Sequence, residues 1–247
     1  GAMKVVYFTP DKSSVLCFFF VLFDASRRLR LDKVLRNYNA TLDSQTGDYW
    51  RQLFCWPAAI ITSPSLGIMT PTYPDNYFFR EGPWSGQEKK GVWFVRKTAG
   101  GKPFREMMPE SERGNWLNFF SICIGISRAV WRLHAAGLAH SDLSHNNILI
   151  DPTSGRAVVI DIDLLVVPGI FPPDVAGTKG YIAPEVLGTM HLKINDPKRK
   201  HPSAATDQHA LSVLIYQYLL FRHPLEGPKI NSALSAEEDD LLSYGAK

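Results

Sequence analysis

Runs of aromatic and β-branched residues mark the first part of the chain. Residues 4–8 and 14–23 are two such runs on either side of a polar turn at 9–13, which predicts a β-hairpin. Residues 56–62 and 66–70 are shorter runs of the same kind and are predicted to be two further strands. The pattern therefore predicts a small β-rich unit at the start of the chain.

Apolar positions at helical spacing appear in three places. Residues 27–38 place Leu and Val on one face with basic residues opposite, and 115–136 repeat large apolar residues on a broad face before Gly137. Residues 207–221 show the same period, with Thr206 as the expected N-cap. Three helices are predicted, the second being the most strongly patterned.

The apolar run at 15–23 has two interpretations. It is nine residues long, far short of the roughly 20 that a membrane helix needs. A signal peptide is the alternative, but Asp11 and Lys12 interrupt the approach and no small-residue cleavage site follows. A buried strand is favoured, and the leading Gly1-Ala2-Met3 is interpreted as a cleavage scar plus a start codon, outside the fold.

The stretch from 140 to 163 carries the candidate chemistry. A polar loop leads into an apolar strand at 148–150, a turn and a second strand at 158–160, so a hairpin would gather Asp142, Asn147 and Asp161 at one end. Carboxylate and amide oxygens are the ligands that Mg²⁺ prefers, and phosphoryl transfer needs a carboxylate to orient the attacking hydroxyl. The alternative is that Asp142 and Asn147 are turn formers.

Motifs in this stretch resemble a known family. His140, Asp142 and Asn147 are spaced as in the catalytic loop of the eukaryotic-like (Hanks-type) protein kinases, and Asp161-Ile162-Asp163 resembles their metal-binding Asp-Phe-Gly. Residues 177–185, which end in Ala-Pro-Glu, resemble the end of an activation segment. The resemblance implies a two-lobed α+β protein-kinase-like fold, with a small β-rich N-lobe and a larger helical C-lobe.

The resemblance also implies roles for single residues. ATP and Mg would be the cofactors and a protein would be the substrate, phosphorylated on serine or threonine. Asp142 would orient the acceptor hydroxyl, while Asn147 and Asp161 would bind the metal. Residues 71–74 correspond to the hinge between the lobes. Met69 and Thr70 are candidates for the nucleotide pocket. His140, Glu185 and Asp207 would have structural roles: Glu185 would face an arginine of the C-lobe, and Asp207 would brace the catalytic loop.

The first third departs from the family pattern. It has no Gly-x-Gly-x-x-Gly, Phe18 stands where a phosphate-binding lysine is expected, and no glutamate precedes Glu81. Lys12 in the hairpin turn is a candidate to reach the phosphates, with an ordinary solvated lysine as the alternative. Two other functions therefore stay open: a pseudokinase acting as a nucleotide-binding scaffold, and a small-molecule kinase of the aminoglycoside or choline type.

The motifs divide the chain into three parts. Residues 4–74 are expected to form the divergent N-lobe, 75–114 an insertion after the hinge with a strand at 92–96, and 115–247 a C-lobe truncated after its F-type helix. Residues 49–57 and 223–227 resemble bacterial kinases that carry a C-terminal helix-hairpin-helix module in tellurite-resistance-type gene clusters. That similarity implies a phosphatase or other products of such a cluster as partners.

Composition and charge bear on the expected partners of the chain and on its cellular compartment. It has 247 residues and a net charge of +3 with dispersed basic residues, so neither nucleic acid nor an anionic membrane is expected as a partner. Three cysteines lie in apolar surroundings without paired spacing. Buried thiols in a reducing compartment are favoured over disulfides, which predicts a cytoplasmic protein.

Overall fold

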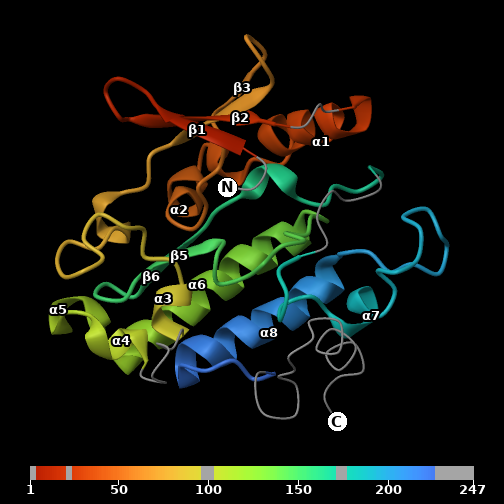
Figure 1. Ribbon diagram of the computed structural model, residues 1–247. Helices are drawn as coiled ribbons and strands as arrows, with labels where there is room; N and C mark the ends of the chain where they lie inside the picture. The colour runs from red at the N-terminus through yellow and green to blue at the C-terminus, as the bar shows by residue number, and fades with distance from the viewer. Residues whose placement is uncertain (1–3, 21–23, 96–102, 171–176, 226–247) are drawn as a thin grey trace.

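An antiparallel sheet organises the first lobe. The computed structural model describes residues 4–20, 24–95, 103–170 and 177–225. Strands β1 (Lys4–Phe8) and β2 (Ser14–Phe19) form the predicted hairpin, and β3 (Ala59–Ile61) and β4 (Gly67–Pro71) complete the sheet in the order β1-β2-β4-β3 (Figure 1). The predicted β-rich unit is confirmed, although positions 21–23 of the second run lie outside the described residues.

Helix α1 (Ala25–Arg36) crosses between β2 and β3 and buries Leu31, Val34 and Leu35. It starts two residues before the predicted segment, because the carboxylate of Asp24 caps it by accepting a hydrogen bond from the Arg27 amide. The indole of Trp56 donates to the Val34 carbonyl at 3.0 Å. Two short helices, η1 (Ala40–Leu42) and α2 (Gly47–Arg51), lie between α1 and β3.

The region after the hinge consists of short helical segments. These are η2 (Asp75–Tyr77), α3 (Val92–Val95), α4 (Phe104–Met107) and α5 (Glu110–Arg113). The strand predicted at 92–96 is wrong for 92–95, which are helical; position 96 lies outside the described residues. A short apolar run of this kind does not separate strand from helix; here Trp93 and Phe94 both pack against Phe79.

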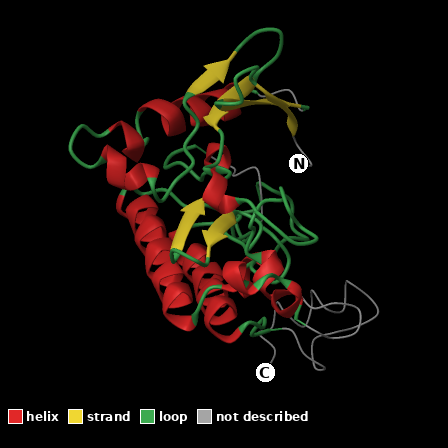
Figure 2. Cartoon of the chain, turned by 90° about the vertical axis from the view of Figure 1, so that its left-hand side faces the viewer, coloured by secondary structure: helices red, strands yellow, loops and turns green. Residues whose placement is uncertain are grey.

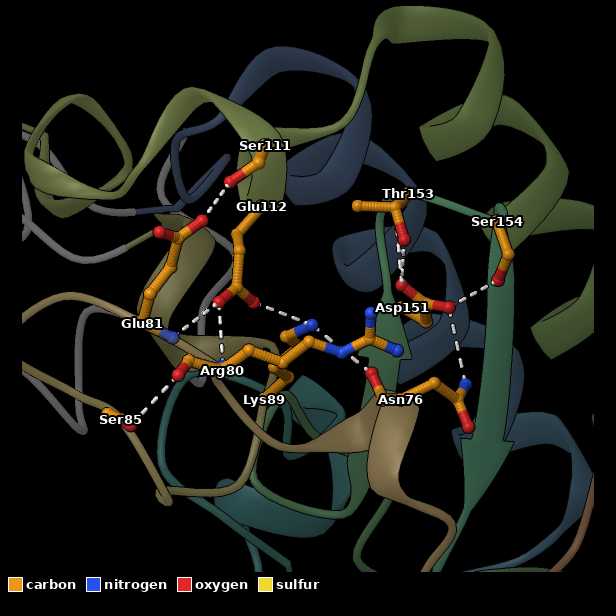
Figure 3. Close-up of polar contacts among 10 residues, drawn as sticks. All are labelled: Asn76, Arg80, Glu81, Ser85, Lys89, Ser111, Glu112, Asp151, Thr153 and Ser154. Carbon is orange, nitrogen blue, oxygen red and sulfur yellow. Dashed lines mark hydrogen bonds and ion pairs between the residues drawn. The ribbon is translucent and has the colours of Figure 1, made fainter.

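A buried ion pair holds this region together. Nζ of Lys89 lies 2.7 Å from Oε2 of Glu112, and each side chain is almost fully buried. The other carboxylate oxygen of Glu112 accepts the amides of Arg80 and Glu81, and Lys89 also donates to the Asn76 carbonyl (Figure 3). Asp151 at the end of β5 accepts from Asn76, Thr153 and Ser154, so the region is tied to the second lobe.

Two long helices form the core of the second lobe. Helices α6 (Trp116–Ala135) and α8 (Ala204–Leu220) lie side by side in both views (Figures 1 and 2), which confirms both predicted helices. Helix α8 starts earlier than predicted: Ser203 is its N-cap, and Thr206 is the third helical residue of a capping box. The short helix α7 (Pro184–Leu187) precedes α8.

A buried hairpin carries the candidate site. Strands β5 (Ile148–Asp151) and β6 (Arg156–Val159) pair antiparallel, and η3 (Ile162–Leu164) follows. The amide of Cys55 donates to the Val159 carbonyl at 2.9 Å, which attaches the first lobe to this hairpin. None of the described helices is long and apolar enough to cross a membrane. Residues 171–176 and 226–247 of the predicted C-lobe lie outside the described residues.

Candidate active site

The loop between α6 and β5 brings two predicted residues together. Nδ2 of Asn147 donates to Oδ2 of Asp142 at 2.9 Å and to its carbonyl at 2.8 Å. The amide of Ile160 donates to the Asn147 carbonyl, which fixes the loop on the end of the hairpin. Thr178, far along the chain, donates its hydroxyl to Oδ1 of Asp142 at 2.6 Å. Asp142 is therefore held from two sides.

Asp207 lies beneath the same loop. Its buried carboxylate accepts the His140 amide at 2.6 Å and the Ser141 amide at 3.3 Å, and lies 3.2 Å from Nε2 of His134. Its position in the first turn of α8 also suits a negative charge. Ser141 has a φ of 63°, a conformation that non-glycine residues adopt only when their surroundings enforce it. The two amide contacts supply part of that enforcement.

His140 and Glu185 occupy separate places. The ring of His140 is buried, and its Nε2 lies 2.9 Å from the Ile160 carbonyl, so it joins the loop to the residue before Asp161. Glu185 is exposed in the first turn of α7. Burial lowers the pKa of His209, and the charge of Glu185 opposes that shift, so these two residues lie near each other.

Asp161 and Asp163 share a lysine from the first lobe. Nζ of Lys4 on β1 lies 2.9 Å from Oδ1 of Asp161, and 2.8 and 3.0 Å from the two carboxylate oxygens of Asp163. The Asp163 side chain is 2% exposed and that of Asp161 is 50% exposed. Asp161 also has a φ of 59°, a second enforced backbone conformation at this site.

The charges of this cluster shift one another. Burial lowers the pKa of Lys4, but the carboxylates of Asp163 and Asp161 more than compensate and raise it above its usual value. Desolvation raises the pKa of Asp161, but the charge of the Lys4 ammonium lowers it by more, so the pKa of Asp161 lies below its usual value. The Asp161 carboxylate is thus ionised at neutral pH and available to a cation.

The donor set suits a magnesium ion. The side-chain nitrogen of Asn147 donates to Asp142, so the side-chain oxygen of Asn147 points away from that contact. The Asp161 carboxylate is half exposed. Magnesium prefers oxygen ligands and is usually held by one or two carboxylates plus phosphates and water. Asn147 and Asp161 are the residues that would hold it here.

The sheet register separates the nucleotide-pocket candidates. Residues paired across antiparallel strands share a face, and faces alternate along each strand. Thr70 pairs with Val15 and so lies on the face of Lys4 and Phe19, whereas Met69 pairs with Leu16 on the opposite face. The same register corrects the interpretation of Phe18.

Phe18 was expected at the position of a phosphate-binding lysine, but it pairs with Val5 and points away from the Lys4 face. Lys12 is exposed in the β1–β2 turn, and its carbonyl accepts the Thr72 hydroxyl at 2.7 Å. This contact places the turn beside the hinge. The lysine that does contact Asp161 is Lys4.

The sequence pattern did not indicate Lys4 or its link to Asp163. Its signal was a single lysine at the first position of an apolar strand, which resembles a solvated end residue until the strand register is known. A cavity of about 520 Å³ behind the hinge is not the predicted site. Tyr73, Trp56 and Val158 help to line it, but Lys4, Asp142, Asn147 and Asp161 do not.

Comparisons with known proteins identify the family of the chain. The profile of the protein kinase domain matches residues 85–244. Three relatives are the serine/threonine-protein kinases PknA of Mycobacterium tuberculosis, WNG2 of Toxoplasma gondii and PknD of Chlamydia felis, at 28%, 32% and 31% identity. The matched regions cover 57%, 51% and 45% of this chain, and 31%, 22% and 13% of the respective relatives.

The chain thus spans less than a third of the length of these curated relatives. The profile covers the loop at 140–147, the Asp161 segment, Ala-Pro-Glu and α8, and it starts after residues 71–74. Most of the chain, including every residue that contacts Asp142 or Asp207 as described above, falls inside the match. The chain therefore belongs to the protein kinase domain family.

Proposed function

We propose that this chain is the catalytic domain of a magnesium- and ATP-dependent serine/threonine protein kinase. The observation that carries the proposal is the position of Asp142, which is held by Asn147 on one carboxylate oxygen and by Thr178 on the other. A carboxylate fixed in this way can accept the hydrogen bond of an incoming hydroxyl without rearranging. The names of the three relatives support serine and threonine as acceptors.

Each residue has a distinct task in this proposal. Asp142 orients the acceptor hydroxyl and takes its proton as the phosphoryl group is transferred. Asn147 and Asp161 hold the metal, which when bound neutralises charge on the nucleotide phosphates. Asp207 keeps the amides of His140 and Ser141 in place, so that the loop enters the reaction already ordered.

The substrate side is assigned to the segment that ends in Ala-Pro-Glu. Thr178 contacts Asp142, and Tyr181 lies three residues further on with its hydroxyl hydrogen-bonded to Gln217 of α8. A peptide bound along this segment would therefore reach Asp142 directly. The segment 177–185 favours a protein substrate over the small-molecule alternative, because it ends in Ala-Pro-Glu and its Thr178 lies directly beside the acceptor position at Asp142.

Partners beyond a protein substrate rest on sequence similarity alone. Residues 49–57 and 223–227 support a place among bacterial kinases with a C-terminal helix-hairpin-helix module. A phosphatase or other products of the same gene cluster are then the proposed partners. Co-purification of tagged chain with each neighbouring gene product would test this, and the absence of a stable pair across the cluster would remove the assignment.

The experiment that tests the proposed function is phosphotransfer from γ-labelled ATP to a degenerate peptide library, with mass spectrometry of the products. Phosphoserine or phosphothreonine is expected from the wild-type chain. Asp142→Asn should retain ATP binding and lose transfer by about 100-fold or more, since general-base assistance contributes about 10² to 10⁴. ATP binding without transfer by the wild-type chain would favour the pseudokinase instead.

A further inference from the structure

The ammonium of Lys4 lies where two carboxylates of unequal exposure meet. Strand β1 pairs Lys4 with Phe19, and Nζ lies 5.7 Å from the centre of the Phe19 ring. The aliphatic stem therefore runs along an apolar surface while the charged end reaches Asp161 and Asp163. Only 13% of the Lys4 side chain is exposed. The position is set by sheet register and packing, so the ammonium is held in a defined place.

Asp163 and Asp161 differ in what they can do for this lysine. Asp163 is buried and offers both oxygens to Lys4, at 2.8 and 3.0 Å. Separating that pair would leave a charge unpaired away from water, which is strongly unfavourable. Asp161 offers one oxygen and is half exposed. Asp161 can thus exchange Lys4 for another cation, whereas separating Asp163 from Lys4 would be strongly unfavourable.

From this asymmetry we infer that Lys4 is the residue that binds the nucleotide phosphates, and that Asp163 is the positioning residue that anchors it. The inference rests on the proposed function, because it assumes that Asp161 turns to a metal ion when nucleotide binds. An ammonium has three donors. When Asp161 leaves Lys4, the donor used at 2.9 Å becomes available to a phosphate oxygen, while Asp163 keeps Lys4 in place.

Other lysines around the hinge have different surroundings. Lys89 is buried against Glu112, and Figure 3 shows its ammonium directed at that carboxylate. Lys90 pairs with Glu88 at 2.9 Å. Lys12 is exposed in the turn whose backbone contacts Thr72. Lys4 donates directly to both Asp161 and Asp163, so it is the candidate that the geometry supports.

The test compares ligands that differ only in their phosphates. Isothermal titration with ATP, inorganic tripolyphosphate and adenosine, each with Mg²⁺, would be made on the wild-type chain and on Lys4→Met. A hydrogen bond to a charged group corresponds to a loss of about 10- to 100-fold in affinity. Lys4→Met should lose that much for ATP and tripolyphosphate and less than about twofold for adenosine. Lys4→Arg should recover part of the loss.

Two further variants separate binding from folding. Lys4→Met combined with Asp163→Leu removes both charges together, which avoids a buried unpaired carboxylate and should preserve the fold. This double variant should show the same selective loss for phosphates. Asp163→Asn alone should weaken ATP, but should add nothing in the Lys4→Met background, because Asp163 acts through Lys4. Lys193→Met, on an exposed loop of the second lobe, is the matched control.

Failure of this inference differs from failure of the proposed function. If wild-type chain binds ATP and Lys4→Met loses ATP and adenosine equally, Lys4 does not contact phosphate. The same conclusion follows if the selective loss appears in Lys12→Met instead. If selective loss is found in Lys4→Met but the wild-type chain transfers no phosphate, the assignment of Lys4 holds and the kinase proposal is wrong. A wild-type chain that binds none of the three ligands would contradict both.

Discussion

The hydroxyl of Thr178 donates a 2.6 Å hydrogen bond to Oδ1 of Asp142 and so joins the start of the Ala-Pro-Glu segment to the catalytic loop. Because Asn147 holds the other oxygen, the carboxylate has little freedom to rotate. The orientation of Asp142 thus depends on a residue of the segment that would receive substrate.

Replacing Thr178 should therefore lower turnover without weakening ATP. Thr178→Val removes the donor at almost constant volume, and we expect kcat to fall about 10-fold, which corresponds to one hydrogen bond. Thr178→Ser keeps the hydroxyl and should stay close to the wild-type value. Steady-state phosphotransfer with a library-derived peptide measures both. Equal activity of the Val and Ser variants would show that the contact is incidental.

Asp207 is predicted to contribute to stability as well as to activity. Its carboxylate is buried and accepts two amides of the catalytic loop. Asp207→Ala should lower the free energy of unfolding by about 2 to 4 kcal/mol, since hydrogen bonds to a charged group contribute about 1.5 to 3 kcal/mol each and part of the loss is recovered by relaxation. Urea unfolding measures it. Asp48→Ala, an exposed surface acid, is the control and should change stability by less than about 0.5 kcal/mol.

His145 in the catalytic loop should make stability depend on pH. Burial, with a smaller contribution from His223, lowers its pKa to about 4. The unfolded chain binds the proton with a pKa of about 6.5 and the folded chain does not until pH falls near 4. The free energy of unfolding is therefore unaffected by this histidine above pH 6.5. It decreases as pH falls from 6.5 to 4, by at most about 3 kcal/mol, because the unfolded chain then binds a proton that the folded chain does not.

A neighbouring hydrogen bond supports the neutral form of His145. The hydroxyl of Tyr181 donates to Gln217, so its oxygen accepts from Nδ1 of His145, which makes Nδ1 the protonated nitrogen of a neutral ring. Unfolding free energies of wild-type chain and His145→Gln, measured between pH 7 and 4, should diverge in slope. Parallel curves would exclude His145 as a source of the dependence.

The Lys89–Glu112 pair offers a test of the region after the hinge. Both side chains are buried and lie 2.7 Å apart. Lys89→Met should lower the free energy of unfolding by about 3 to 5 kcal/mol, because Glu112 would remain buried without its partner. Adding Glu112→Gln should restore part of the loss, since the neutral amide can stay buried beside Met. Denaturant unfolding of the wild-type chain, Lys89→Met and the double variant would measure these free energies. A further loss of stability in the double variant would mean that the two residues do not act as a pair.

The parts of the site that sequence could predict are those set by nearby residues. Asp142 and Asn147 share one loop, and the hairpin that follows brings Asp161 to the same end, so spacing and strand pattern were enough. Helices at 115–136 and 207–221 were predictable from their long apolar period. The start of α8 was placed late because Ser203 and Thr206 are both good capping residues, and only the backbone shows which one is the cap.

Lys4 could not be predicted in the same way. Its contacts with Asp161 and Asp163 join residues more than 150 positions apart, and they depend on the register of β1 with β2 and on how the sheet sits over the hairpin. A shift of one residue in that register would place the lysine on the other face. Because the register was unknown, Phe18 was also assigned to the position of the phosphate-binding lysine, although it lies on the opposite face from Lys4. The segment at 92–95 was too short for its period to separate strand from helix.

The proposed function requires Asn147 and Asp161 to form a working magnesium and ATP site beside Asp142. Thermal unfolding with and without Mg²⁺ and ATP, on wild-type chain and Asp161→Asn, would test this requirement. At about 100 times the dissociation constant, ligand adds about 2.7 kcal/mol, a rise of about 5 to 10 °C for a chain of this size. We expect that rise only with Mg²⁺ present and only in the wild-type chain. No shift at millimolar ATP, or an equal shift in Asp161→Asn, would contradict it.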